Sequence, residues 1–193
     1  ITMSNTFCMA PWHDFHIVTD GGIKGCCVMA SGPTKGRYMT NGIPVTVEDG
    51  LDAGMNSDTA KSLRKAMLKG VWHPECKRCQ DEEASGMRSM RGLYEERWGK
   101  RFSFEDAQKI TDSKTGAVPK EHKPFFYDIQ LGNLCNLKCR ICGPQCSSTW
   151  VPDHQKLMKF GDKWEQPIGE GRPIIKIEHV AGKKYTMTPD PFA

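Results

Sequence analysis

The sequence contains no long apolar segment and no block of like charges. No apolar run approaches the roughly 18 residues that a membrane-spanning helix needs, and the N-terminus lacks the charged region and apolar core of a signal peptide. The 27 basic and 23 acidic residues give a net charge of +4 and are interspersed, which argues against a nucleic-acid-binding surface. We therefore expect a cytoplasmic protein that binds neither nucleic acid nor a membrane.

Apolar residues are also scarce, at 38% with a mean hydropathy of −0.55, while 19 glycines and 12 prolines indicate many loops. A length of 193 residues allows one ordinary domain or two small ones. We predict a loop-rich α+β protein that a bound cofactor helps to hold together. Because the chain begins with Ile1 and ends at Ala193 without an obvious terminal element, we expect a fragment of a longer protein.

Nine cysteines are present, an odd number that a complete set of disulfides cannot use. Their clustered spacings favour ligation of a metal or an iron–sulfur cluster in a reducing compartment. Cys135, Cys139 and Cys142 are spaced CxxxCxxC and follow a predicted strand over residues 125–131. Three thiolates can hold three irons of a 4Fe-4S cubane and leave the fourth iron open to a small molecule.

Upstream, two predicted strands over residues 15–19 and 23–29 flank an Asp-Gly turn and form a hairpin. This hairpin would bring Cys26 or Cys27 back toward Cys8. Which of the two faces inward depends on the pleat, because successive side chains of a strand point to opposite faces.

The remaining elements follow from capping residues, periodicity and turn residues. Residues 31–54 are predicted to be mostly loop. Helices are expected over 57–69, 74–96 with an interruption at Gly86, 103–110 and 147–160, and a final hairpin over 174–180 and 184–188.

Zinc is the alternative to iron–sulfur ligation, because Cys76 and Cys79 form a CxxC pair. Cys146 is the cysteine that could complete a four-thiolate set with the triplet, although a structural or free thiol is the favoured interpretation. His73, three residues before Cys76, is the one histidine placed to replace a cysteine ligand. A zinc-binding structural or interaction protein therefore stays open as a second function.

The CxxxCxxC sequence after a strand resembles the signature of radical S-adenosylmethionine (radical SAM) enzymes, although Ile141 stands where the family commonly has an aromatic residue. The resemblance implies a partial (β/α)6 barrel and a 4Fe-4S cluster held by Cys135, Cys139 and Cys142. It also implies that S-adenosylmethionine chelates the open iron and is reductively cleaved to a 5'-deoxyadenosyl radical. An electron donor such as flavodoxin or ferredoxin is implied as a partner, and the cofactor supplies the difficult chemistry.

The upstream cysteines resemble the twitch or SPASM-type domains that bind auxiliary 4Fe-4S clusters in this family. The resemblance implies one auxiliary cluster held by Cys8, Cys26, Cys76 and Cys79, with Cys27 as the alternate to Cys26. It covers residues 7 to about 150 and is carried by Phe7–Trp12, Gly25–Cys27, Asn56-Ser57, Arg64, Met67–Gly70, Cys76–Glu83, Gly132–Cys135 and Ser147–Trp150.

This resemblance divides the chain into a twitch-like domain over residues 1–111, a linker over 112–124, and the start of a radical SAM domain over 125–193. No Gly-Gly-Glu sequence, which in the family contacts the S-adenosylmethionine amine, occurs after Cys142. We therefore expect the front part of a radical SAM enzyme, inactive as a fragment. Relatives with such domains often act on a peptide or protein, so a substrate of that class is expected by analogy.

Overall fold

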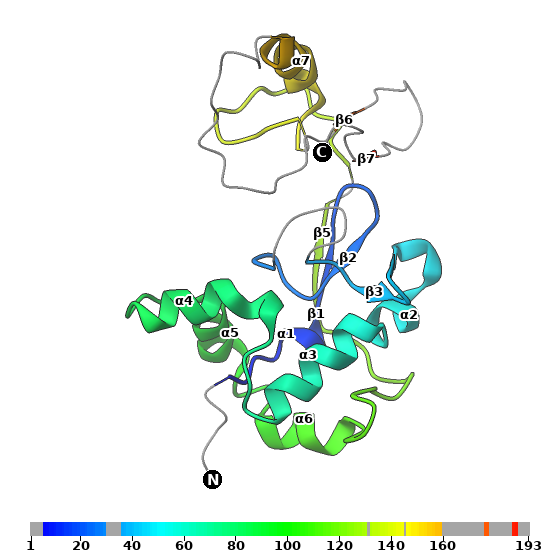
Figure 1. The fold of residues 1–193 in the computed structure, drawn as a ribbon, viewed down its shortest axis with the longest axis vertical. Helices are drawn as coiled ribbons and strands as arrows, with labels where there is room; N and C mark the ends of the chain where they lie inside the picture. Colours follow the sequence, from blue (N-terminus) through cyan, green and yellow to red (C-terminus); the bar gives the residue numbers. More distant parts are fainter. Residues whose placement is uncertain are drawn as a thin grey trace. The chain divides into compact units, whose positions relative to one another are not determined.

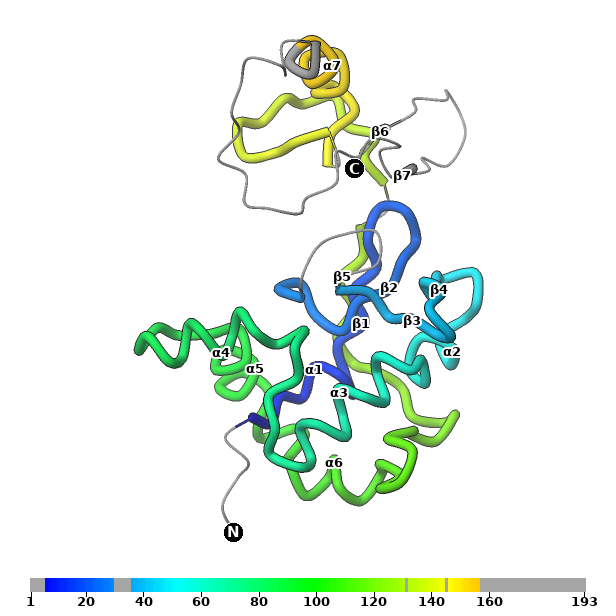
Figure 2. Tube along the Cα trace, viewed as in Figure 1, coloured from blue at the N-terminus to red at the C-terminus, as the bar shows by residue number. Residues whose placement is uncertain are grey.

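A computed structural model describes residues 6–29, 36–130, 132–144, 146–159, 176–177 and 187–188 (Figures 1 and 2). The chain forms two compact units, Ile1–Ile17 with Gly21–Ile129, and Val18–Asp20 with Gln130–Ala193. Helices and short strands are mixed, as an α+β protein requires, and the described residues form no closed barrel. None of their helices is both long and apolar enough to cross a membrane.

A three-stranded sheet forms the centre of the first unit. Strand β1 (Asp14–Ile17) pairs antiparallel with β2 (Ile23–Lys24) and parallel with β5 (Phe126–Ile129). The predicted hairpin is confirmed, although β2 is shorter than the expected 23–29 strand. The register places His16 opposite both Lys24 and Asp128. Because side chains alternate along a strand, one face of this sheet is apolar and the other carries charged groups.

The longest helix of the first unit, α3 (Asp58–Leu68), confirms the helix predicted over 57–69. The Ser57 hydroxyl accepts a hydrogen bond from the Ala60 N–H at 3.2 Å and caps its N-terminus. Gly70, with φ of +73°, ends the helix in the left-handed conformation that glycine adopts most readily. The helix packs against α1 (Ala10–His13), α6 (Phe104–Ile110) and strand β3 (Met39–Thr40) (Figure 1).

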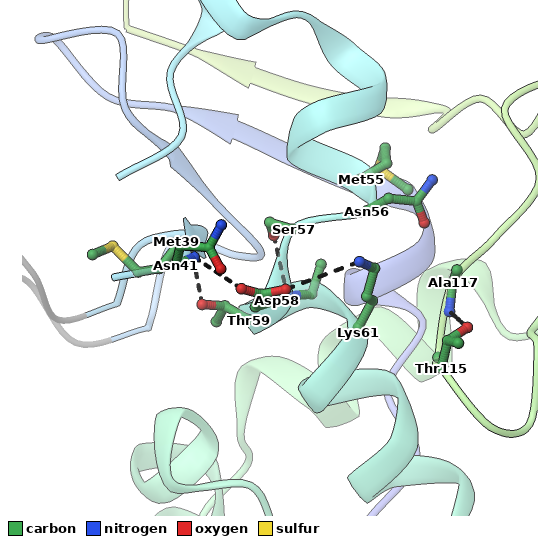
Figure 3. A network of polar contacts seen from close by, with 12 residues as sticks. Met39, Asn41, Met55, Asn56, Ser57, Asp58, Thr59, Lys61, Thr115 and Ala117 are labelled. Carbon is green, nitrogen blue, oxygen red and sulfur yellow. Dashed lines mark hydrogen bonds and ion pairs between the residues drawn. The ribbon is translucent and has the colours of Figure 1, made fainter. Parts of the chain in front are cut away.

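Residues 36–54 contain more helix and strand than the loop predicted over residues 31–54. Strands β3 and β4 (Ile43–Pro44) form a small hairpin whose turn residues, Asn41 and Gly42, have φ of 51° and 76°. Figure 3 shows how α3 holds this hairpin: the Asn41 N–H donates to an Asp58 oxygen at 2.9 Å, and the Met39 N–H donates to the Thr59 hydroxyl at 3.1 Å. A 3-10 helix, η1 (Val47–Asp49), and helix α2 (Leu51–Met55) follow.

The predicted helix over 74–96 is three elements, η2 (Pro74–Cys76), α4 (Lys77–Ala84) and α5 (Met90–Trp98). Its interruption at Gly86 is confirmed, with φ of +76°. Helix α6 confirms the helix predicted over 103–110. The Ser103 and Asp106 side chains form a capping box at its start.

Residues 112–124, expected to be a linker, lie against the first unit. The Asn56 side chain donates to the Val118 carbonyl at 3.1 Å and accepts from the Val118 N–H at 3.0 Å, which mimics a strand pair. His122 contacts the Trp12 carbonyl at 2.9 Å. These bonds tie the segment to residues far away in the sequence, so the division between the compact units falls after Ile129.

In the second unit, a 3-10 helix, η3 (Ser148–Trp150), leads into α7 (Val151–Lys159). Together they span the helix predicted over 147–160, up to residue 159. Strands β6 (Lys176–Ile177) and β7 (Met187–Thr188) pair antiparallel, as the final hairpin requires. The rest of that hairpin lies outside the described residues.

Candidate metal centres

One cavity of the first unit is lined by four cysteines from three separate segments of the sequence. Cys8 precedes α1, Cys26 follows β2, Cys76 ends η2, and Cys79 lies in the first turn of α4. Cys79 is buried and the other three are partly buried. The structure therefore brings together the four residues that the sequence nominated as an auxiliary-cluster set.

The turn that carries Cys26 depends on close backbone packing. A side chain at Gly25 would place its Cβ 2.7 Å from the buried Tyr38 hydroxyl, which is closer than atoms in contact approach. The Gly25 N–H also points to the Met29 sulfur at 3.2 Å. Glycine at position 25 thus lets the chain turn tightly after β2 and place Cys26 in the wall of the cavity.

Three thiols of this cavity, those of Cys8, Cys26 and Cys76, are poor acids without a bound cation. Burial raises the pKa of Cys8 and Cys26, and it raises the pKa of Cys76 to about 12. The neighbouring thiolates of Cys26, Cys76 and Cys79 raise the pKa of Cys8 further, which shows that these sulfurs share one electrostatic environment. A bound metal would reverse this preference, because its positive charge stabilises the thiolate and the coordinated thiol releases its proton.

Cys27 has a different environment from its neighbour. Its side chain is exposed and does not line the cavity. Burial and then the Asp14 and Asp128 carboxylates raise the pKa of Cys27, so it faces the charged side of the sheet. The turn after β2 thus places Cys26, and not Cys27, in the wall of the cavity.

That charged side of the sheet holds a buried acid that the sequence did not single out. Asp14 is 1% exposed, and one of its oxygens accepts a hydrogen bond from the Tyr94 hydroxyl at 2.5 Å. The other oxygen has no hydrogen-bond partner among the residues that the structure describes. On the same face, His16 and Asp128 contact each other at 2.8 Å. The sequence offers no motif that would pair Asp14 with Tyr94, because 80 residues separate the two.

Asp14 makes the stability of the first unit depend on pH. Burial raises its pKa from 3.8 to about 7, an effect that the Tyr94 hydrogen bond reduces and the Asp128 charge increases. The folded chain therefore keeps a proton that the unfolded chain releases. The retained proton contributes to the free energy of unfolding. This stabilising contribution is complete below about pH 4 and is lost, at roughly 1 kcal/mol per pH unit, as the pH rises to about 7.

We expect Asp14→Asn to become progressively more stable than the wild type between pH 5 and pH 7, and the difference to level off above that. Urea unfolding at pH 5, 6, 7 and 8 under reducing conditions measures it. Asp52→Asn, at an exposed position, is the matched control and should track the wild type. A stability difference for Asp14→Asn that does not change with pH would contradict the assignment.

The loop of Cys135, Cys139 and Cys142 in the second unit is fixed by hydrogen bonds from the segment that follows it. The Ser147 and Thr149 hydroxyls donate to the Leu137 carbonyl at 2.6 and 2.7 Å. The Trp150 indole N–H donates to the Cys139 carbonyl at 3.1 Å. Polar residues after the last cysteine thus hold the backbone that presents the thiols.

Four thiols lie near one another in this loop. Desolvation, and then the charges of Cys139, Cys146 and Cys135, raise the pKa of Cys142. Cys135 and Cys142 are partly exposed, while Cys139 and Cys146 are exposed. The loop also presents apolar side chains to solvent, since Leu134, Leu137 and Ile141 are 78%, 58% and 97% exposed.

All nine cysteines are free, so their thiols are available as ligands. Within the described part of the chain, no three cysteine, histidine or acidic side chains converge as the ligands of one metal ion would. His73 is engaged within the protein. One of its ring nitrogens accepts from the Glu75 N–H at 3.2 Å and the other contacts the Ser62 hydroxyl at 3.1 Å.

Comparison of the chain with protein-family models, curated proteins and solved structures finds no match. Its function is therefore argued from the two sets of cysteines.

Proposed function

We propose that this chain is an iron–sulfur protein of the radical SAM type. In this proposal Cys8, Cys26, Cys76 and Cys79 hold an auxiliary 4Fe-4S cluster. Cys135, Cys139 and Cys142 hold a second cluster with one iron open to S-adenosylmethionine. The bound cofactors supply reductive cleavage of S-adenosylmethionine, and the resemblance extends the proposal to a peptide or protein substrate.

The observation that carries this proposal is the convergence of four cysteines from three separate segments on one cavity. Three partly buried thiols with raised pKa values are an unusual group to gather without a cation to bind. No disulfide uses them. A positively charged iron–sulfur core accounts for the set, because it compensates the thiolates that burial disfavours.

The spacing of the thiols bears on which metal they suit. Zinc–sulfur bonds of about 2.3 Å in a tetrahedron require sulfurs within about 3.8 Å of one another. Among the described residues no three ligands meet this requirement, and the four cysteines line one cavity instead. In a cubane each thiolate binds a different iron, so four thiols around one cavity are the donor set that a cluster needs.

The second unit contributes ligands on a braced loop. Ser147, Thr149 and Trp150 fix the carbonyls of Leu137 and Cys139, which limits the backbone around the thiols. A cluster held by this loop would have the exposed apolar side chains of Leu137 and Ile141 available to cover it. These residues orient and shield, which is the role of the protein around a cofactor that carries the reaction.

Zinc binding is the second candidate function, and one observation favours it. Cys146 lies close enough to Cys142 for its charge to raise the pKa of that thiol, so the loop offers four thiols. A four-cysteine zinc site in the second unit would serve a structural or interaction role.

Anaerobic reconstitution with iron and sulfide tests the two candidates. The cluster proposal predicts about eight irons per chain, the sum of two cubanes, and a 4Fe-4S signal in the reduced protein. A parallel sample purified without reconstitution is analysed for zinc. Stoichiometric zinc that iron and sulfide cannot replace would overturn the proposal in favour of the zinc-binding function.

A further inference from the structure

Arg91 lies at the four-thiol cavity and belongs to no cysteine motif. Its side chain lines the cavity together with Cys8 and Cys79. It is 21% exposed, and its guanidinium carbon lies 5.7 Å from the centre of the Trp72 ring. The Arg91 charge is thus partly removed from solvent at the wall of the cavity.

The position of Arg91 is fixed by two sets of hydrogen bonds. Two guanidinium nitrogens donate to the two Glu83 oxygens at 2.8 and 2.6 Å, and a third donates to the Phe7 carbonyl at 3.3 Å. Phe7 immediately precedes Cys8. Ser89 also donates to Glu83 at 2.5 Å. Such bidentate pairs restrict both the distance and the orientation of the charge.

We propose that Arg91 is a positioning residue that raises the reduction potential of the cluster held by Cys8, Cys26, Cys76 and Cys79, with Glu83 opposing it. This inference rests on the proposed function of that cavity. Reduction adds one negative charge to the cluster, and a fixed positive charge nearby stabilises the reduced form more than the oxidised form. The Glu83 carboxylate, which does not line the cavity, acts in the opposite direction.

Other charges near the cavity are less suited to this role. Lys24 is 5% exposed and donates to the Met29 carbonyl at 2.9 Å, but it lies two residues from Cys26 and supports the same turn. Arg78 also lines the cavity, but its side chain is 66% exposed and forms an ion pair with Glu82. Water screens such a charge more strongly.

The test uses the full chain with Cys135, Cys139 and Cys142 replaced by alanine, so that the N-terminal set alone can hold a cluster. After reconstitution with iron and sulfide, a redox titration followed by electron paramagnetic resonance gives the midpoint potential. Arg91→Met should lower the equilibrium constant for reduction about tenfold, which is about 59 mV for one electron. Arg91→Lys keeps the charge and should shift the potential less.

Glu83→Gln should raise the midpoint potential, and a loss of structure alone would not do so. If Arg91→Met binds no iron, the potential of Glu83→Gln alone tests whether this ion pair sets the potential of the cluster. Arg88→Met is the matched control, because Arg88 also pairs with a glutamate, Glu96, but does not line the cavity. Its potential should equal that of the parent. Unchanged potentials in Arg91→Met and Glu83→Gln, or shifts in the same direction, overturn the inference while leaving the cluster in place. A parent chain that binds no iron refutes the proposed function itself.

Discussion

Replacing Arg64 by methionine is expected to destabilise the first unit by about 3 kcal/mol or more, because three buried carbonyls lose their hydrogen-bond donor. Arg64 is 0% exposed and lies on α3. Its guanidinium donates to the carbonyls of Pro11 at 3.0 Å, Gly116 at 2.8 Å and Met55. One side chain thus connects α1, α2 and the 112–124 segment to the longest helix.

The electrostatics of Arg64 indicate that this effect comes from hydrogen bonding. Burial lowers the pKa of Arg64 to about 10, so the side chain remains charged at neutral pH. Methionine removes the cost of burying that charge, and it fills most of the same space. Both changes work in favour of the variant, so the loss that remains measures the unsatisfied carbonyls.

Chemical unfolding followed by circular dichroism measures this effect. Arg97→Met, at an exposed position on α5, is the control and should change the free energy of unfolding by less than about 0.5 kcal/mol. Arg64→Lys keeps the charge but cannot direct donors at three carbonyls, so it should fall between the two. A loss below about 1 kcal/mol for Arg64→Met would refute the bracing role.

Replacing Cys26 by alanine is expected to remove about half of the bound iron, from about eight atoms per chain to about four. Cys27→Ala should keep all of it. The two residues are adjacent and chemically identical, but Cys26 lines the cavity with Cys8, Cys76 and Cys79, whereas Cys27 is exposed toward Asp14 and Asp128.

Iron and acid-labile sulfide are counted after anaerobic reconstitution of both variants. Circular dichroism spectra of the two variants before reconstitution establish that each is folded. The opposite result, with iron lost from Cys27→Ala and kept by Cys26→Ala, would show that the turn after β2 rearranges on cluster binding. Equal loss from both would contradict the assignment of a single ligand.

The sequence predicts the elements whose signals are local. The helices predicted over residues 57–69 and 103–110 are observed, and the side chains of Ser57 and Ser103 cap their N-termini as expected. The hairpin formed by β3 and β4 was not predicted, although Asn41-Gly42 is a strong signal for a two-residue turn. The glycines and prolines around it favoured a loop.

Contacts between distant residues could not be predicted from the same signals. The Asn56 bonds to Val118 change an apparent linker into part of the first unit. Likewise, cysteine spacing nominated Cys8, Cys26, Cys76 and Cys79, but their common cavity depends on how the hairpin and the helices pack. Buried polar partners such as Asp14 and Tyr94 have no spacing that identifies them.

The iron content of the chain in which Cys135, Cys139 and Cys142 are replaced by alanine tests the cluster assignment most directly. We expect about four irons and four sulfides per chain, bound by the cysteines of the first unit alone, and loss of that iron when Cys76 and Cys79 are also replaced. A folded protein that binds no iron, or that binds one zinc ion in its place, would contradict the assignment of a cluster to the four-thiol cavity.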